Sequence, residues 1–117
     1  MVKSYSGTGN WKSWVVGGLY TDSGKKQGTL SGTGAEATYS LNGVGIGYAF
    51  NSGPDGSNFD LYTKWYSPPT TSSYDARGNS LGAQEIAGPA PFGNGTNYFM
   101  IHSTSGNGEY VAAGMIY

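Results

Sequence analysis

Residues 43–50, GVGIGYAF, alternate strictly between a large side chain and glycine or alanine. A period of two residues is that of a β-strand, whose successive side chains point to opposite faces of a sheet. We expect the large residues of this strand to face the core. The small ones then form a flat face against which another sheet, an aromatic ring or a ligand can lie. The large residues are Val44, Ile46, Tyr48 and Phe50.

Further apolar stretches rich in aromatic and β-branched residues predict strands at 11–20, 35–41, 59–66, 97–103 and 109–117. Polar segments rich in glycine separate them. NSGPDGSN (51–58) reads as a tight turn, and TDSGKKQG (21–28) as another in which Gly24 takes a positive φ. No stretch has a convincing helical pattern. The chain is therefore predicted to be all-β, a single domain over 1–117.

The arrangement expected for such strands is a β-sandwich of about six to eight mostly antiparallel strands, with a small closed barrel as the alternative. Residues 67–95 interrupt the pattern, because they hold four of the five prolines and show little periodicity. We expect a long loop there, and a loop of that length in a small domain is usually functional or partly structured.

Charge and composition exclude several classes of function. Six basic residues spread along a chain of net charge −1 do not form the cluster that neutralises phosphates, so nucleic-acid binding is disfavoured. With no cysteine there is no disulfide and no thiolate metal site. No signal peptide or membrane-length apolar run is visible, which predicts a cytoplasmic or non-classically secreted protein and leaves the compartment open.

Catalytic and metal signatures are weak. The one histidine, His102, follows no nucleophile motif and is interpreted as a partly exposed strand residue. The segment 55–60, DGSNFD, lacks the glycine and glutamate of an EF-hand loop and is interpreted as a hairpin turn. We predict no enzymatic activity, no metal and no cofactor.

The stretch 59–66, FDLYTKWY, has two distinct faces. Alternation places Phe59, Leu61, Thr63 and Trp65 on the core side, and Asp60, Tyr62, Lys64 and Tyr66 on the other. An aromatic face beside fixed hydrogen-bonding groups suits a sugar or a lipid headgroup. The alternative is that the two tyrosines are packing residues on the outer face of the sheet.

A ligand site is predicted around this outer face and the loop that follows it. The prolines stiffen the loop, and a stiff loop loses less entropy on binding. Trp11 is added as a possible exposed anchor, although packing in the core is the alternative for Trp11 and Trp14. The candidate ligand-binding residues are Tyr62, Lys64, Tyr66, Ser67, Pro68, Tyr74, Asp75 and Trp11.

Residues 43–75, GVGIGYAFNSGPDGSNFDLYTKWYSPPTTSSYD, resemble the central block of actinoporin-like cytolysins, whose fold some fungal lectins share. GSNFDLY, followed by an aromatic and proline-rich stretch, also resembles the aegerolysins. Both resemblances imply a β-sandwich. The first implies that Ser67, Pro68 or Pro69, and Tyr74 contact a phosphocholine headgroup. Residues 1–10 cannot form the amphipathic helix with which actinoporins make pores, so pore formation is not implied.

Three functions follow as hypotheses. The first is lectin-like, non-enzymatic binding of glycans through exposed aromatic and polar loop residues. The second is binding of a sphingomyelin or phosphocholine headgroup, with peripheral membrane contact. The third is a self-assembling structural β protein, because the glycine face and the apolar last strand favour pairing with another copy.

Overall fold

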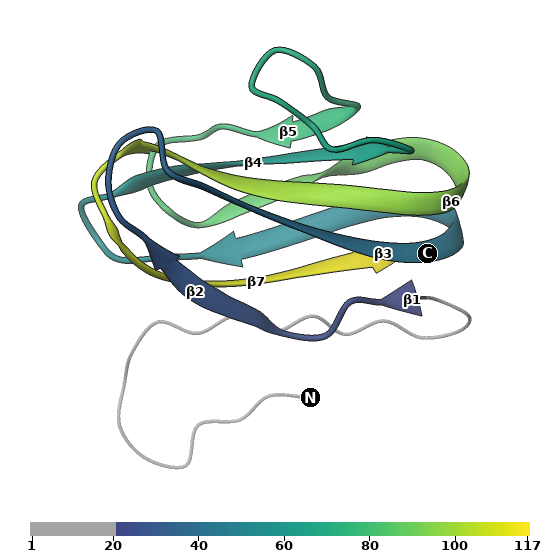
Figure 1. Ribbon diagram of the computed structural model, residues 1–117, viewed down its shortest axis with the longest axis horizontal. Coiled ribbons are helices and arrows are strands. Elements are labelled where there is room, and N and C mark those ends of the chain that lie inside the picture. Colours follow the sequence, from purple (N-terminus) through teal and green to yellow (C-terminus); the bar gives the residue numbers. More distant parts are fainter. Residues whose placement is uncertain (1–20) are drawn as a thin grey trace.

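The computed structural model describes residues 21–117, which form seven β-strands and no helix (Figure 1). All pairings are antiparallel, as the alternating patterns predict. The strands are β1 (Thr21–Asp22), β2 (Lys26–Leu30), β3 (Glu36–Ser52), β4 (Asn58–Trp65), β5 (Ala76–Gly78), β6 (Glu85–Ser105) and β7 (Gly108–Ile116).

The long strands β3 and β6 organise the sheet. They pair with each other from Glu36 opposite His102 to Asn51 opposite Glu85. The strand order is β1-β7-β3-β6-β4-β5, and β2 pairs with β7 beside β1. In Figure 1, β4 and β5 lie at the top, β7, β1 and β2 lie at the bottom, and β3 and β6 run between them.

The β3–β6 ladder changes register between Gly45 and Ala49, and this irregularity divides the sheet into two layers. The first half of β3 and the second half of β6 join β4 and β5 in one layer. The second half of β3 joins β7 in the other. Gly45 has a φ of +144°, which glycine adopts without strain. The bend therefore lies where the chain is richest in glycine.

The two layers pack face to face. A Cβ added at Gly114 in β7 would lie 2.6 Å from the ring of Phe99 in β6, although these two strands are not hydrogen-bonded neighbours. Tyr39 of β3 and Tyr110 of β7 share a hydrogen bond between their hydroxyl groups. The β-sandwich predicted from the sequence is thereby confirmed, and so is the core placement of Phe59, Leu61 and Trp65.

The predicted core face of residues 43–50 is wrong. Gly45, Gly47 and Ala49 are buried, whereas Val44 is 58% exposed. The inner side of this strand has room only for small residues, since a Cβ at Gly47 would lie 2.9 Å from Nδ2 of buried Asn97. A second layer lies against the small face, which is one of the alternatives that the pattern left open.

The predicted loop over 67–95 is also corrected. It contains β5 and the first part of β6, including Pro89 and Pro91. Proline lacks the N–H of a ladder and is tolerated at a sheet edge. The part of β6 that contains the two prolines pairs only with β3, because β4 pairs with β6 only from Asn97 onward. The predicted positive φ of Gly24 is confirmed at +73°, although β2 already begins at Lys26.

Candidate functional site

Residues 66–75, the β4–β5 loop, project from the top of the molecule in Figure 1. Asp75 ties the loop to β4 twice. Its carboxylate accepts a hydrogen bond from the Trp65 backbone N–H at 2.9 Å, and its own N–H donates to the Thr63 carbonyl at 2.8 Å. Lys64 Nζ donates to Ser73 Oγ at 2.7 Å. The C-terminal end of the loop, at Ser73 and Asp75, is therefore held against the sheet.

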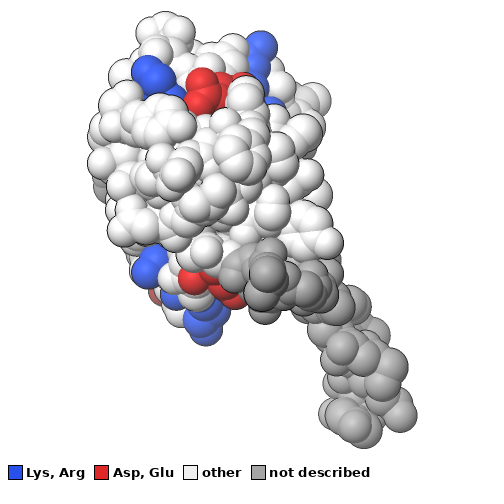
Figure 2. All heavy atoms as spheres, turned by 90° about the vertical axis from the view of Figure 1, so that its right-hand side faces the viewer, with Lys and Arg blue, Asp and Glu red and all other residues white. Residues whose placement is uncertain are grey.

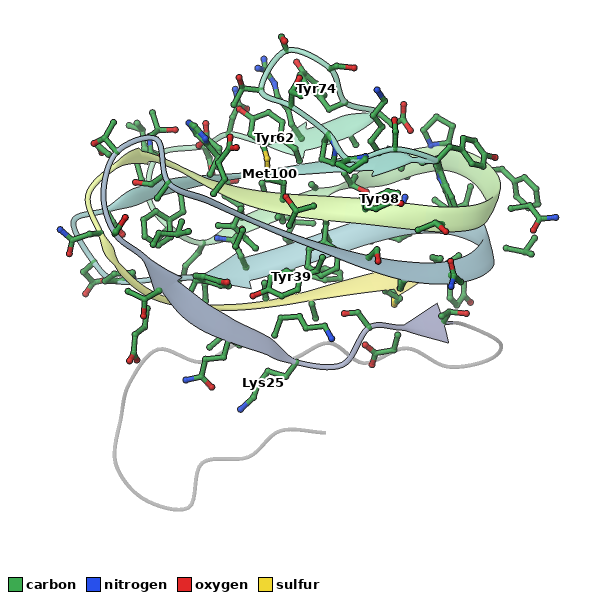
Figure 3. All side chains as sticks on the ribbon, viewed as in Figure 1. Lys25, Tyr39, Tyr62, Tyr74, Tyr98 and Met100 are labelled. Carbon is green, nitrogen blue, oxygen red and sulfur yellow. The ribbon has the colours of Figure 1, made fainter. Side chains whose placement is uncertain are left out.

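An aromatic stack covers the outer face of the sheet beneath this loop. Tyr74 meets Tyr62 edge-on with ring centroids 5.3 Å apart, and the Arg77 guanidinium lies 5.3 Å from the centre of the Tyr74 ring. Figure 3 shows Tyr74 above Tyr62, with Met100 below it. Tyr62 is only 4% exposed and Met100 only 2%. Tyr62 therefore packs, as the alternative interpretation had it, and offers no open face to a ligand.

The charges around Tyr62 fit this packing role. Burial, and then the nearby Asp60 carboxylate, raise the pKa of the Tyr62 hydroxyl above its ordinary value. His102 lies beside the stack and pairs through Nδ1 with the Glu36 carboxylate at 2.8 Å. His102 is partly exposed on its strand, as predicted from the sequence.

Tyr66 leaves the alternating pattern at the end of β4. Its φ is +73°, the left-handed region that a side chain with a Cβ rarely adopts, and it is 66% exposed. Its N–H donates to the Thr96 carbonyl at 2.8 Å, and its hydroxyl accepts from the Asn94 N–H at 3.3 Å. The surrounding backbone thus holds a strained, exposed aromatic residue in place, a feature that often marks a functional position.

Three more exposed apolar side chains belong to the segments of β3 and β6, and to the C-terminal residue after β7, that meet at the bend of the sandwich. Val44 is opposite Asn94 in the ladder, and Phe92 is 68% exposed. Tyr117 is 57% exposed and exchanges backbone hydrogen bonds with Ile46. We call Val44, Tyr66, Phe92 and Tyr117 the aromatic end. Except for Tyr66, the sequence interpretation missed it, because exposure at a bend has no periodic signal.

A sequence signal for this end does exist in the distribution of charge. Segments 42–50, 65–74, 86–101 and 110–117 contain no Asp, Glu, Lys or Arg. Figure 2 faces the side of the molecule where the long strands bend, and shows charged side chains at its top and bottom with an uncharged surface between them. Exposed apolar groups on an uncharged surface are typical of an interaction site.

The predicted site residues therefore separate into two groups. Tyr62, Lys64, Tyr74 and Asp75 come together at the second end of the loop, with Tyr62 buried. Tyr66, Ser67 and Pro68 are exposed at its first end, next to the aromatic end. Trp11 lies outside the described residues.

Neither a metal centre nor a membrane span is found in the described part of the chain. Residues 21–117 contain no group of three or more His, Asp or Glu that could hold a metal ion. None of their secondary structure is a helix able to cross a membrane.

Comparison with known proteins identifies a solved structure of the same fold. No family model matches the chain, and no curated protein matches it. Among solved structures, that of Aeromonas hydrophila PliG, a periplasmic lysozyme inhibitor of g-type lysozyme, has the same fold with a TM-score of 0.56. The match covers 82% of this chain and 86% of PliG at 14% identity. The resemblance of residues 43–75 to cytolysins stays a prediction.

The predicted function is corrected on two findings. The PliG structure is that of an inhibitor of an enzyme, rather than a lectin or a cytolysin. The sheet face predicted to hold a ligand is closed, because Tyr74 covers Tyr62. Glycan binding, headgroup binding with membrane contact, and self-assembly into oligomers are therefore not retained.

Proposed function

We propose that this protein is a non-enzymatic domain that binds another protein, and that it blocks an enzyme of the lysozyme class. The observation that carries the proposal is the aromatic end, four exposed apolar side chains on an uncharged surface. The match to PliG supports it, since PliG is described as an inhibitor of g-type lysozyme.

The chemistry of the aromatic end suits a protein partner. Aromatic residues are enriched at the centres of protein interfaces, where charged residues are depleted. A few such residues carry most of the binding energy. The Tyr66 backbone is fixed by its hydrogen bond to Thr96, and Phe92 lies between Ala90 and Gly93, which both pair with β3. Little entropy is therefore lost when a partner binds.

We also propose that the protein acts outside the cytoplasm. PliG is described as periplasmic, and an inhibitor must occupy the same compartment as its enzyme. The absence of cysteine suits any compartment, because the sandwich is held by packing and hydrogen bonds.

The test measures binding of the purified chain to a g-type lysozyme by calorimetry, and inhibition of its lysis of bacterial cell walls. We expect micromolar or tighter binding, with a loss of about tenfold or more for the double variant Phe92→Ala, Tyr117→Ala. Leu81→Ala is the matched control, because Leu81 is apolar and 94% exposed but lies between β5 and β6, outside the aromatic end. The proposal is wrong if the wild-type chain neither binds nor inhibits, or if both variants behave alike.

A further inference from the structure

We infer that Trp65 is a positioning residue for binding, which holds Phe92 in the orientation that the aromatic end presents to a partner. This role rests on the proposed function and goes beyond it, because Trp65 is not part of the exposed surface. It follows from a bulge of the chain at Phe92, from the hydrogen bond between the Trp65 indole and Pro91, and from the burial of Trp65.

The pairing of β3 with β6 does not hold Phe92 directly. Pro91 and Phe92 of β6 together face the single residue Ile46 of β3, an arrangement known as a β-bulge. The N–H and the carbonyl of Ile46 each form a hydrogen bond of 2.9 Å with Tyr117, so these backbone groups point away from β6. A bulge re-aims side chains and is common next to functional sites, but it interrupts the ladder. The orientation of Phe92 therefore depends on another contact.

Trp65, the last residue of β4, supplies that contact from inside the sandwich. Its indole N–H donates to the Pro91 carbonyl at 2.7 Å, and this carbonyl belongs to the peptide group that joins Pro91 to Phe92. Its ring also lies against Gly93, since a Cβ added there would be 2.3 Å from the ring. Trp65 therefore contacts the residues on both sides of Phe92.

Trp65 is itself held in place. Its backbone N–H donates to the Asp75 carboxylate at 2.9 Å, and it lies opposite Asn97 in the β4–β6 ladder. It is 4% exposed and belongs to the core cluster. Its ring also packs against that of Tyr66, with centroids 5.8 Å apart. A side chain fixed at several points can keep an exposed neighbour in one orientation, and a neighbour that is already ordered loses less entropy on binding.

The effect of Trp65 on binding passes through Phe92, because a partner does not reach a buried side chain. Loss of the indole N–H leaves the Pro91 carbonyl without this donor, so the bulge is no longer held in one orientation. The free energy of binding then includes the cost of ordering Phe92, which the wild-type chain orders on folding. Affinity should therefore fall although every residue of the aromatic end is present.

The experiment measures binding of the full chain to a g-type lysozyme by calorimetry. Trp65→Phe keeps an aromatic ring and removes the indole N–H. Trp65→benzothienylalanine keeps the bicyclic shape and replaces the N–H by sulfur, so it tests the hydrogen bond with a side chain that fills the same space. Each change should weaken binding about fivefold or more. In a Phe92→Ala background each should weaken it about twofold or less, because the residue through which Trp65 acts is gone.

Fluorine NMR of the free chain, labelled with fluorophenylalanine, reports on Phe92 itself. The Phe92 resonance, assigned by its loss in Phe92→Ala, should move toward its position in the unfolded chain when Trp65 is changed in either way. The resonance of Phe59, at the other end of β4, should stay in place. A purely structural role of Trp65 would not single out Phe92.

Phe59→Leu is the matched control for stability. Phe59 is buried in the same core cluster and on the same strand as Trp65, but it lies away from the bulge. This change should lower the urea midpoint as much as Trp65→Phe or more, because it removes part of a buried ring. It should nevertheless bind the lysozyme as the wild type does.

The inference is overturned if either change at Trp65 leaves the affinity or the Phe92 resonance as in the wild type. It is also overturned if the loss of affinity persists in the Phe92→Ala background, or if Phe59→Leu weakens binding equally. The proposed function survives each of these results, because the aromatic end still accounts for the binding. If the wild-type chain does not bind the lysozyme at all, both proposals fail.

Discussion

Tyr74 lies edge-on against Tyr62, with ring centroids 5.3 Å apart at an interplanar angle of 61°. This contact joins a loop residue to the middle of β4 and closes the sheet face that the sequence had marked as a binding face. The covered face supports the projecting β4–β5 loop, whose other contacts with β4 are mainly hydrogen bonds.

Removal of the Tyr74 ring should loosen this support. We expect Tyr74→Ala to lower the free energy of unfolding by about 1–2 kcal/mol, because an aromatic pair and buried area are lost together. The pKa of the Tyr62 hydroxyl should then fall toward its ordinary value as water reaches it. Urea unfolding measures the first effect, and NMR titration of labelled tyrosine measures the second.

Tyr117→Ala is the control for this prediction, because its ring is 57% exposed. It should change the free energy of unfolding by no more than about 0.5 kcal/mol. Similar unfolding curves for the two variants would contradict a supporting role for Tyr74.

From Tyr110 we predict how the stability of the protein responds to alkaline pH. Burial, and then its hydrogen bond with Tyr39, raise the pKa of the Tyr110 hydroxyl well above the ordinary value of 10.0. A raised pKa means that the native state keeps the proton more tightly. Its contribution to stability is therefore complete below about pH 10 and is lost as pH rises toward the native-state pKa.

Unfolding measured between about pH 8 and pH 11.5 tests this prediction. The wild-type free energy of unfolding should fall above about pH 10, and Tyr110→Phe should fall less steeply over the same range. At neutral pH the variant should lose about 1 kcal/mol, the contribution of one hydrogen bond. Parallel pH profiles for the two proteins would show that Tyr110 does not carry the effect.

At position 66 we expect stability and binding to favour different residues. Glycine adopts a φ of +73° without the penalty of about 1 kcal/mol that a side chain pays there. The ring is 66% exposed, so little packing is lost with it. Tyr66→Gly should therefore keep or slightly raise the free energy of unfolding, while affinity for a g-type lysozyme falls about tenfold. A variant that unfolds more easily and still binds normally would refute this account.

The core beside Gly93 has no room for a larger side chain. A Cβ there would lie 2.3 Å from the ring of Trp65, whose indole N–H is fixed by a hydrogen bond to the Pro91 carbonyl at 2.7 Å. Gly93→Ala should lower the free energy of unfolding by about 1–3 kcal/mol. Gly32→Ala is its matched control, because a Cβ at Gly32 meets nothing within 4 Å. Thermal unfolding of both variants tests this prediction, and equal midpoints would contradict a steric conflict at Gly93.

Most of the secondary structure could be predicted from local patterns. The faces of 59–65 were predicted correctly, because two residues per repeat and a run of large apolar side chains leave one choice of inner face. The turn at Gly24 was also predictable, since its positive φ is a local requirement. The strand containing Pro89 and Pro91 was not, because proline is acceptable only where a neighbouring strand is missing, which is a property of the sheet.

The candidate site was less predictable than the fold. Tyr62, Lys64, Tyr74 and Asp75 lie near one loop, since they are close in sequence. The role of Tyr62 depended on where Tyr74 folds back. Phe92 and Tyr117 were missed, because they join Tyr66 only through pairings between segments far apart in the chain.

The sequence by itself determined that the chain is all-β, that it turns at Gly24 and within 51–58, and which side of β4 is buried, because each of these follows from side chains a few residues apart. Only the tertiary structure decided which face of 43–50 points inward. The alternation of glycine with large residues is symmetric, and the choice depended on the space left by Asn97 and the opposite layer. The tertiary structure likewise placed Tyr66 outside its strand pattern and brought the aromatic end together, because the bend of β3 and β6 joins residues that no local pattern connects.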